Sequence, residues 1–502
     1  MVDRVTNIPT TALSGRSVLK TDLTAFNAAT LKDDLARVLP QHTHNRQQIR
    51  QLQEYHRGWH SAIQAREKTT RTDVDNKITV NYAQSITRDI VGYFLGKPIQ
   101  YTHRRGSFKK QMEIFRGALD AENKPLVDFK IAETASICGV GYRGIFVERN
   151  PKNGTSLRLL SLEPQNTFVV YHSDPIKGAA YAVTFYDTSA DNAATRFYKV
   201  YTPEFMYLFR DETVNGNDVI GPGALELVGE PTRISFGGGL PIIEYPNNQW
   251  RLGDWETAIS LMDAIDFVTS DGVNDIQQAV NSVLVAMGME MDEDTFAQLS
   301  SNGFLNVANI PPGVNPVVEF ISQAMDAKVG KEMRDYLEST LRVVVGVPDR
   351  KTRSGGGGDT GDAVFMRDGW QDIDLVAAAK EPYFVQAERE ALNVMLYILE
   401  TKKELTGLKP TDMEIHFNRN KTANLQSKAQ VYQILSQGEA ALAPADALDI
   451  ADLTTNEHDV IMRMNAYHAE RDAKLRENAA SVSNNEGPNS AEGGSSSAGD
   501  EG

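Results

Sequence analysis

The chain has 502 residues, of which 41% are apolar and 24% charged, proportions typical of a folded protein with about three domains. Its 51 basic and 67 acidic residues give a net charge of −16, which argues against a protein that wraps DNA. With Cys138 as its one cysteine, the chain has neither an internal disulfide framework nor a cysteine-based metal cage. Because no apolar run reaches the ~20 residues that span a bilayer, and residues 1–20 lack a signal-peptide core, neither a membrane nor secretion is expected.

The first half of the chain is predicted to form an α+β domain. Residues 1–30 are polar and poorly patterned, which predicts a mobile arm. Helical spacing of apolar residues follows over 31–71 and 76–95. Later runs of β-branched and aromatic residues, bounded by Asn, Gly, Pro or Asp, predict strands at 145–147, 167–171, 180–186, 197–201 and 240–243.

The second half is predicted to consist mainly of long helices. Apolar residues follow the 3.6-residue period over 254–280, where Asp254 is expected to be the N-cap, and again over 323–345. Between these helices the sequence predicts a small module, with a short helix at 293–299 and strands at 283–285, 304–307 and 317–320. Two long helices that carry a small tip are unusual in an enzyme.

A loop rich in basic residues and glycine is expected at 348–362. It contains the cations Arg350, Lys351 and Arg353 and the glycines Gly355, Gly356, Gly357 and Gly358. Contacts within such a loop cannot order it, because glycine loses the most backbone entropy when its conformation is fixed.

The C-terminal part is predicted to be helical and to end in a tail. A helix is expected over 363–402 with a kink near Pro382, because proline removes one hydrogen bond of the helix. A strand at 413–417 and helices over 423–476 follow. Residues 477–502 contain no basic residue and few apolar ones, which predicts a disordered acidic tail.

Local motifs give little support for catalysis. Residues 139–144 spell GxGxxG, but here a helix precedes and a strand follows, the reverse of a dinucleotide site, so we expect a turn. His56 and His60 could share a metal ion, but the glutamate of HExxH is missing and Trp59 favours a packed helix face. Since the chain has neither a GxxxxGK[ST] phosphate loop nor a GxSxG elbow, we expect no catalytic residue, cofactor or metal.

Charge is distributed unevenly in the second half. Residues 252–327 contain twelve acids and no Lys, Arg or His, whereas 328–353 contain seven basic residues and four acids. One interpretation is simply an acidic surface followed by a basic one. The other is a DNA conduit, in which an acidic wall repels phosphate so that the polymer slides, while a short basic loop touches it weakly.

The order of these segments resembles the portal proteins of tailed double-stranded DNA bacteriophages, of the siphophage type, over roughly residues 31–470. Residues 81–86 (NYAQSI) and 93–101 (YFLGKPIQY) are similar to part of that family's wing domain, and 240–248 (LPIIEYPNN) to the lead into its stem. The glycine-rich loop with the long helix after it resembles the family's tunnel loop and helix. Residues 415–419 (IHFNR) resemble the strand before the crown.

The resemblance implies a mostly helical α+β portal fold with wing, stem, clip and crown, assembled as a ring with a central channel. The clip is assigned by position alone, because its sequence matches least. The implied segments are an arm (1–30), wing (31–250), stem helices (251–280 and 319–347), clip (281–318), tunnel loop (348–362), long kinked helix (363–402), crown (403–476) and tail (477–502).

The resemblance also implies a function without catalysis. A ring, usually of twelve subunits, is assembled in the host cytoplasm and occupies one capsid vertex of the virion. A separate terminase ATPase pumps DNA in through the channel, and the DNA later leaves the same way. The expected partners are double-stranded DNA, the large terminase subunit, a head-completion or adaptor protein, and the major capsid and scaffolding proteins.

Three groups of candidate site residues follow from this interpretation. The tunnel loop would face DNA through the cations and glycines named above. The clip would dock terminase and the adaptor through the clip methionines, which are Met287, Met289 and Met291, and through the acids Asp292, Glu293 and Asp294. The stem would line the channel with Asp263, Asp266, Asp271 and Asp275.

Two alternatives stay open. A DNA-processing enzyme could use clustered carboxylates to hold metal ions as a nuclease does, although acids on amphipathic helices are usually the solvated face. A passive scaffold protein could be built from the long helices alone. Electron microscopy separates rings with a central hole from monomers and from rods.

Overall fold

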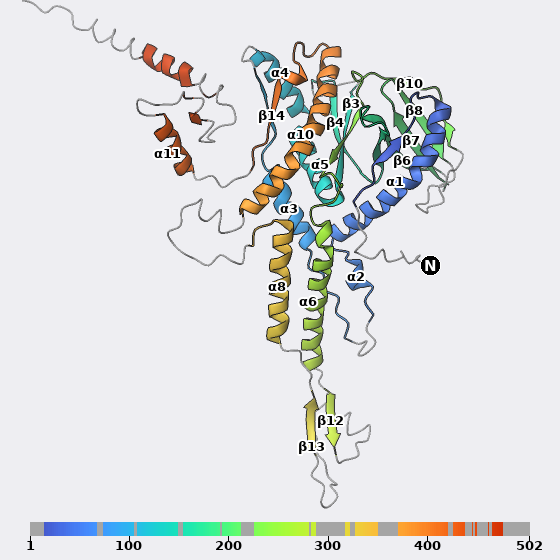
Figure 1. Ribbon diagram of the computed structural model, residues 1–502, viewed down its shortest axis with the longest axis vertical. Coiled ribbons are helices and arrows are strands. Elements are labelled where there is room, and N and C mark those ends of the chain that lie inside the picture. Colours follow the sequence, from blue (N-terminus) through green and yellow to red (C-terminus); the bar gives the residue numbers. More distant parts are fainter. Residues whose placement is uncertain are drawn as a thin grey trace, which may run out of the picture. The chain divides into compact units, whose positions relative to one another are not determined.

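The computed structural model describes residues 15–67, 74–104, 108–148, 154–190, 193–211, 225–280, 283–287, 317–321, 327–349, 370–419, 425–436, 444, 447–448, 460 and 464–474. The chain divides into two compact units, Met1–Lys421 and Thr422–Gly502. Figure 1 labels the elements along the chain. In the described ranges, no helix combines the length and the apolar composition that a membrane span needs.

The larger sheet of the first unit has seven described strands: β1 (Leu19–Thr21), β5 (Thr167–His172), β6 (Ala179–Ala190), β7 (Ala193–Tyr201), β8 (Phe205–Asp211), β9 (Glu226–Leu227) and β10 (Thr232–Arg233). They lie in the order β1-β5-β6-β7-β8-β10, and β9 pairs with β8. The strands predicted at 167–171, 180–186 and 197–201 are confirmed as β5, β6 and β7.

Strand β1 corrects the prediction for the N-terminal arm. It pairs in parallel with β5, with Leu19 opposite Val170. The first helix, α1 (Ala28–His56), starts at a capping box formed by Asn27 and Thr30 and packs Leu31 and three further buried residues, Leu35, Val38 and Leu39, into the same core as β5 and β6. The mobile arm is therefore wrong for residues 15–30, whereas residues 1–14 lie outside the described ranges.

The predicted helices at 31–71 and 76–95 are shorter in the structure. After α1 comes α2 (Ser61–Gln64), and the second predicted helix is α3 (Tyr82–Phe94). Asn81 caps α3, because its side chain accepts a hydrogen bond from the amide of Gln84. The residues just before it, 74–81, are not helical.

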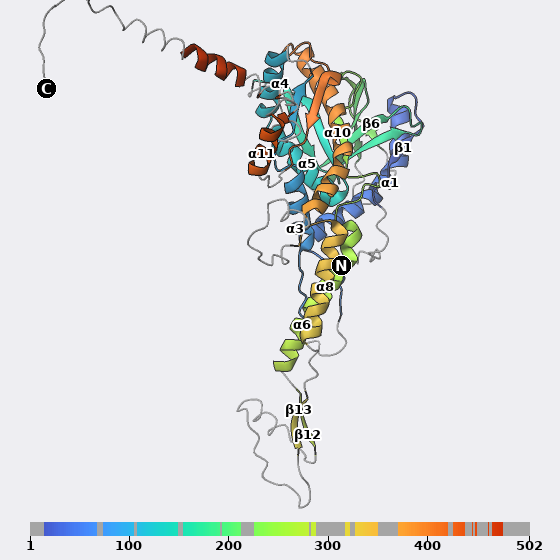
Figure 2. The same ribbon diagram turned by 60° about the vertical axis from the view of Figure 1, so that its left-hand side comes forward.

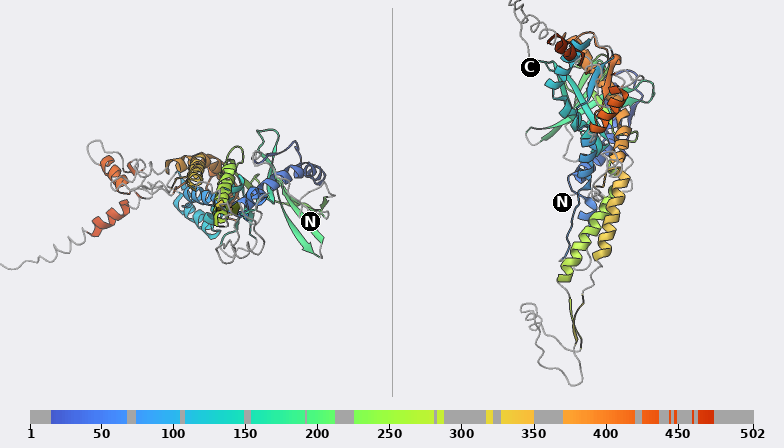
Figure 3. Two further views of the ribbon diagram at one scale, coloured as in Figure 1. Left: turned by 90° about the horizontal axis from the view of Figure 1, so that it is seen from below. Right: turned by 90° about the vertical axis from the view of Figure 1, so that its left-hand side faces the viewer.

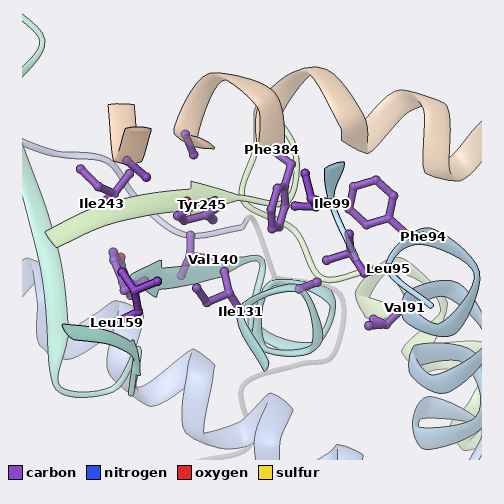
Figure 4. Packing of buried hydrophobic residues seen from close by; sticks show 14 of the residues in the cluster. Val91, Phe94, Leu95, Ile99, Ile131, Val140, Leu159, Ile243, Tyr245 and Phe384 are labelled. Atoms are coloured by element: carbon purple, nitrogen blue, oxygen red, sulfur yellow. The ribbon is translucent and has the colours of Figure 1, made fainter. Parts of the chain in front are cut away.

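A second sheet lies at the centre of the larger core. It contains β3 (Val140–Val147), β4 (Leu157–Leu162) and β11 (Ile242–Pro246) in the order β11-β3-β4. Two further helices, α4 (Lys109–Ala121) and α5 (Lys124–Cys138), precede it in sequence. Helix α5 contacts β3 and β4, and α10 (Trp370–Thr401) contacts β11 and β3. Figure 4 shows Phe94 of α3 and Tyr245 of β11 gathered around Phe384 of α10.

The turn predicted for the GxGxxG sequence is confirmed only at Gly139, because residues 140–144 form the start of strand β3. Gly139 ends α5 with φ = 80°, and β3 begins at the next residue. A Cβ at Gly139 would lie 1.9 Å from the carbonyl oxygen of Arg251, so no other residue fits there without moving the backbone.

Two long helices, α6 (Ile259–Val280) and α8 (Ala327–Val345), confirm the periods found at 254–280 and 323–345. They contact each other and lie side by side in every view (Figures 1, 2 and 3). Between them in sequence, β12 (Val283–Met287) and β13 (Val317–Ile321) pair antiparallel, which confirms the outer two predicted strands. The strand at 304–307 and the helix at 293–299 lie outside the described residues.

The remaining elements continue toward the second unit. Helix α10 confirms the helix predicted over 363–402 from residue 370 to 401, while 363–369 lie outside the described residues and the kink near Pro382 stays a prediction. Strand β14 (Met413–His416) pairs with β2 (Gln100–His103) and therefore belongs to the first unit, whereas the crown at 403–476 stays a prediction. The second unit contains α11 (Leu425–Leu435) and helical residues 464–474.

Candidate functional site

The α6 helix starts from a buried polar anchor. A short 3₁₀ turn, η3 (Glu256–Ala258), leads into it, and Trp255 before that turn is fully buried. Arg16 forms a buried ion pair with Glu256, whose second oxygen accepts the amide hydrogen of Gly253. These contacts fix the first turn of α6 to the domain core.

Asp254 is not the N-cap that the sequence predicted. Its carboxylate accepts hydrogen bonds from Ser136 Oγ at 2.6 Å, from Asn247 Nδ2 at 2.8 Å and from Lys380 Nζ at 2.6 Å. It therefore joins α5 and α10 to the start of α6 instead of capping the helix.

One polar face of α6 holds the extended segment 76–80. The amide of Val80 donates to Asp266 Oδ1 at 2.7 Å, that of Ile78 to Ser270 Oγ at 2.9 Å, and that of Asn76 to Asn274 Oδ1 at 2.8 Å. Two residues of extended chain rise about 6.6 Å and four residues of helix about 6 Å, so the two periods match. These side-chain acceptors explain why 76–80 is extended although its sequence reads as helix.

The acids at the top of this face are buried inside the subunit. Asp263 accepts a hydrogen bond from the hydroxyl of Tyr55 at 2.9 Å, and Asp266 pairs with Nδ1 of His60. The ring of His60 stacks on Tyr55 with centroids 3.7 Å apart. Desolvation raises the pKa of Asp263 above its usual value, and the charge of Asp266 adds to the effect.

This arrangement corrects the prediction for two of the channel-lining acids. The exposed fraction is 7% for Asp263 and zero for Asp266, and both carboxylates bind partners of their own subunit. They cannot line a water-filled channel. Asp271 and Asp275 are partly exposed, and Asp271 forms an ion pair with Arg66, so for these two the channel position stays a prediction.

An apolar stripe on α8 is left exposed. The helix buries Leu341 and Val345 against the core, but a separate face carries apolar side chains that are 49–76% exposed. We call this face the α8 stripe; its members, spaced at helical intervals, are Val329, Met333, Tyr336, Val343 and Val344. On α6, Val273 and Ile276 are also exposed.

The first two residues of the predicted tunnel loop are held at the end of α8. Arg342 donates to the carbonyl oxygen of Pro348 at 3.0 Å and lies 3.7 Å from Asp349. Gly346 has φ = 66°, and a Cβ there would lie 2.7 Å from Val376 of α10, so the chain turns tightly against that helix. The chain thus leaves α8 from a defined point.

Most of the predicted site residues cannot be placed. The tunnel-loop cations and glycines, from Arg350 to Gly358, lie outside the described ranges, as do Met289, Met291, Asp292, Glu293 and Asp294. Met287 is the last residue of β12. Within the described ranges, His60, Asp263 and Asp266 are the one group with the geometry of metal ligands.

Sequence reasoning missed the partners of the α6 acids. The sequence suggests only His56 as a partner for His60, but the ring of His56 lies near Trp255 instead. No local signal could reveal that His60 meets Asp266, because 206 residues separate them.

Comparison with known proteins agrees with this architecture. No curated protein matches the chain. The family described as phage portal protein, SPP1 Gp6-like, matches residues 35–443, which include the α6–α8 pair and the core around α10. Because this match covers well over half of the sequence, the chain belongs to that family of phage portal proteins.

Proposed function

We propose that copies of this chain close into a ring, usually of twelve subunits, through whose channel terminase packages viral DNA and the genome later leaves. Because the chain belongs to a family of phage portal proteins, it is a capsid component of the virion. In the ring, α6 and α8 of each subunit would stand around the channel as the stem. The portal would provide the passage, and terminase would supply the energy.

The α8 stripe is the observation that carries the proposal. Apolar side chains that stay half exposed or more along one helix face are unfavourable in water, and full burial of each stabilises by about 1.5–3 kcal/mol. The polar face of α6 is already occupied by segment 76–80, so it is not free to receive another subunit. We infer that the stripe packs on a neighbouring copy, because a closed ring repeats such a contact in every subunit.

The proposal also assigns roles to the tunnel loop and the clip, most of whose residues lie outside the described ranges. The tunnel loop would begin at Pro348, whose carbonyl oxygen accepts a hydrogen bond from Arg342, and its cations would make a basic constriction in the channel. Solvated cations bind phosphate weakly and reversibly, which suits a loop that must let DNA pass. The clip, which includes β12 and the start of β13, would dock terminase and later the adaptor.

Two loop variants test the role in packaging. In one, Arg350, Lys351 and Arg353 are all changed to Ser; in the other, Gly355, Gly356, Gly357 and Gly358 are all changed to Ala. If the loop touches DNA, both variants assemble as the wild type does but yield fewer full heads or heads that leak DNA. Wild-type packaging and retention in both would reduce the loop to a linker.

The nuclease alternative is weakened because the two acids that converge, Asp263 and Asp266, are not accessible to DNA. A carboxylate–metal nuclease needs acids that converge where a phosphodiester can reach them. Asp263 and Asp266 do converge, but they are enclosed by Tyr55, His60 and segment 76–80. A DNA duplex cannot contact them there.

A further inference from the structure

Three side chains of metal-ligand type meet where α6 leaves the domain core. Asp263 and Asp266 lie three residues apart and therefore on one face of α6, and His60 precedes α2. One nitrogen of His60 and one oxygen from each carboxylate lie within 4.8 Å of one another. All three side chains are buried, and that of His60 is completely enclosed.

The charges of this cluster do not balance. His60 can supply at most one positive charge against two carboxylates. The other donors to the acids, the hydroxyl of Tyr55 and the amide of Val80, are neutral. Two buried carboxylates side by side are unfavourable without a compensating cation.

The two ring nitrogens of His60 have different surroundings. Nδ1 faces the carboxylates and pairs with Asp266, so it is the nitrogen that an ion in this cluster would contact. Nε2, on the other side of the ring, is buried and has no hydrogen-bond partner in the part of the chain that the structure describes. Tyr55 stacks on one face of the ring and keeps water away from it.

We propose that His60, Asp263 and Asp266 bind a divalent transition-metal ion, with zinc as the first candidate. One imidazole and two carboxylates suit zinc, whereas magnesium and calcium prefer oxygen ligands alone. With Zn–N and Zn–O bonds of about 2.0–2.2 Å, tetrahedral ligands lie about 3.4 Å apart, so atoms within 4.8 Å need only small shifts.

The surrounding contacts suit such a site. Ligating carboxylates are usually held by further hydrogen bonds, and here Tyr55 orients Asp263 while the amide of Val80 orients Asp266. The bound ion would join the segment between α1 and α2, which carries His60, to the first turns of α6, to which segment 76–80 is also hydrogen-bonded. Its role would be structural, because the site is closed to solvent. This inference does not depend on the proposed passage of DNA.

Zinc titration of the full-length protein tests the proposal. The protein is stripped with EDTA, dialysed and titrated with zinc alone, and bound zinc is counted by mass spectrometry. We expect one zinc per subunit and a melting temperature roughly 3 °C higher at zinc 100-fold above Kd. Zinc-edge X-ray absorption should show one imidazole among oxygen ligands.

Two matched variants localise the ion. Asp263→Asn keeps the shape of a ligand but removes its charge, and should weaken zinc binding at least about 10-fold. Asp271→Asn makes the same change on the same helix at the partly exposed partner of Arg66, and should bind zinc as the wild type does. Stoichiometric binding lost in the first variant and kept in the second supports the site.

Several results would overturn the proposal. The first is that the wild-type protein binds less than one zinc per subunit. The second is that Asp263→Asn binds zinc as tightly as the wild type, and the third is that the absorption spectrum shows no imidazole ligand on the bound zinc. If Asp263→Asn does not fold, the wild-type titration and the absorption spectrum still decide. If the tunnel-loop variants packaged DNA as the wild type does, the proposed role of the loop would be wrong, but the zinc measurements would be unaffected.

Discussion

Neutralising Glu388 should destabilise the first unit strongly. Glu388 is completely buried on α10 and accepts hydrogen bonds from the hydroxyls of Tyr101 at 2.7 Å and Tyr245 at 2.9 Å. Its carboxylate also lies 3.0 Å from Lys124 Nζ and 3.2 Å from a guanidinium nitrogen of Arg143. In Glu388→Gln the tyrosine contacts can persist, but two buried cations then share Asp128 alone.

The magnitude follows from the contacts and from the pKa. Removing one partner of a buried ion cluster costs about 3–5 kcal/mol, because a charge is left uncompensated. Burial by itself raises the pKa of Glu388, but Arg143 and Lys124 outweigh it and lower the pKa from 4.5 to about 2. At 1.36 kcal/mol per unit this corresponds to about 3 kcal/mol. The two figures agree in order of magnitude.

Urea unfolding of the wild type and of Glu388→Gln measures this loss. Because the folded pKa lies below the unfolded one, the stabilisation is complete above pH 4.5 and is lost as the pH falls toward 2. The difference between the two proteins should therefore be largest near neutral pH and shrink below pH 4.5.

Glu390→Gln is the matched control, since it makes the same change two residues along the same helix at an exposed position. Desolvation and the nearby Glu244 raise the pKa of Glu390, so removing its charge should change stability by no more than about 0.5 kcal/mol. If Glu388→Gln lowered the free energy of unfolding no more than this control does, or lowered it equally at every pH, the charge of Glu388 would not stabilise the first unit as proposed.

Three further predictions concern the α6–α8 pair and the clip. Tyr336→Asp on the α8 stripe should prevent ring closure without unfolding the subunit, whereas Lys331→Asp on another face of α8 should leave ring closure unchanged. Light scattering measures ring formation in both variants, and circular dichroism checks that both are folded. A Tyr336→Asp variant that still forms rings would count against a role of the stripe in assembly. Ser270→Ala should leave the amide of Ile78 without its partner, cost about 1 kcal/mol and speed hydrogen exchange at 76–80, and unchanged exchange would contradict this. Charged residues in place of the clip methionines should abolish terminase binding but leave rings intact, and unchanged packaging in extracts would exclude the clip as the docking site.

Long periodic patterns were the most predictable part of the fold. The apolar period identified α6, α8 and α10, and dense β-branched runs identified β5, β6 and β7, because in each case one face or segment is consistently buried. The short strands β1 and β2 were missed. Each has three or four residues and depends on pairing with a distant partner, as Leu19 does with Val170, so no local pattern marks it.

The stem acids show where sequence reasoning fails in the candidate site. All four look alike in sequence, as carboxylates on an amphipathic helix. The structure separates them, because Tyr55 and His60 enclose Asp263 and Asp266 while Asp271 and Asp275 stay partly exposed. Asp266 also accepts the amide hydrogen of Val80 in segment 76–80, so long-range contacts of the same face of α6 underlie both errors.

Electron microscopy of the purified full-length protein distinguishes a ring from the alternatives. We expect closed rings with a central hole, in which the α8 stripe of each subunit is covered by its neighbour and Asp271 and Asp275 face the channel. A population of stable 55.4 kDa monomers, or of open rods, at micromolar concentration would contradict this expectation.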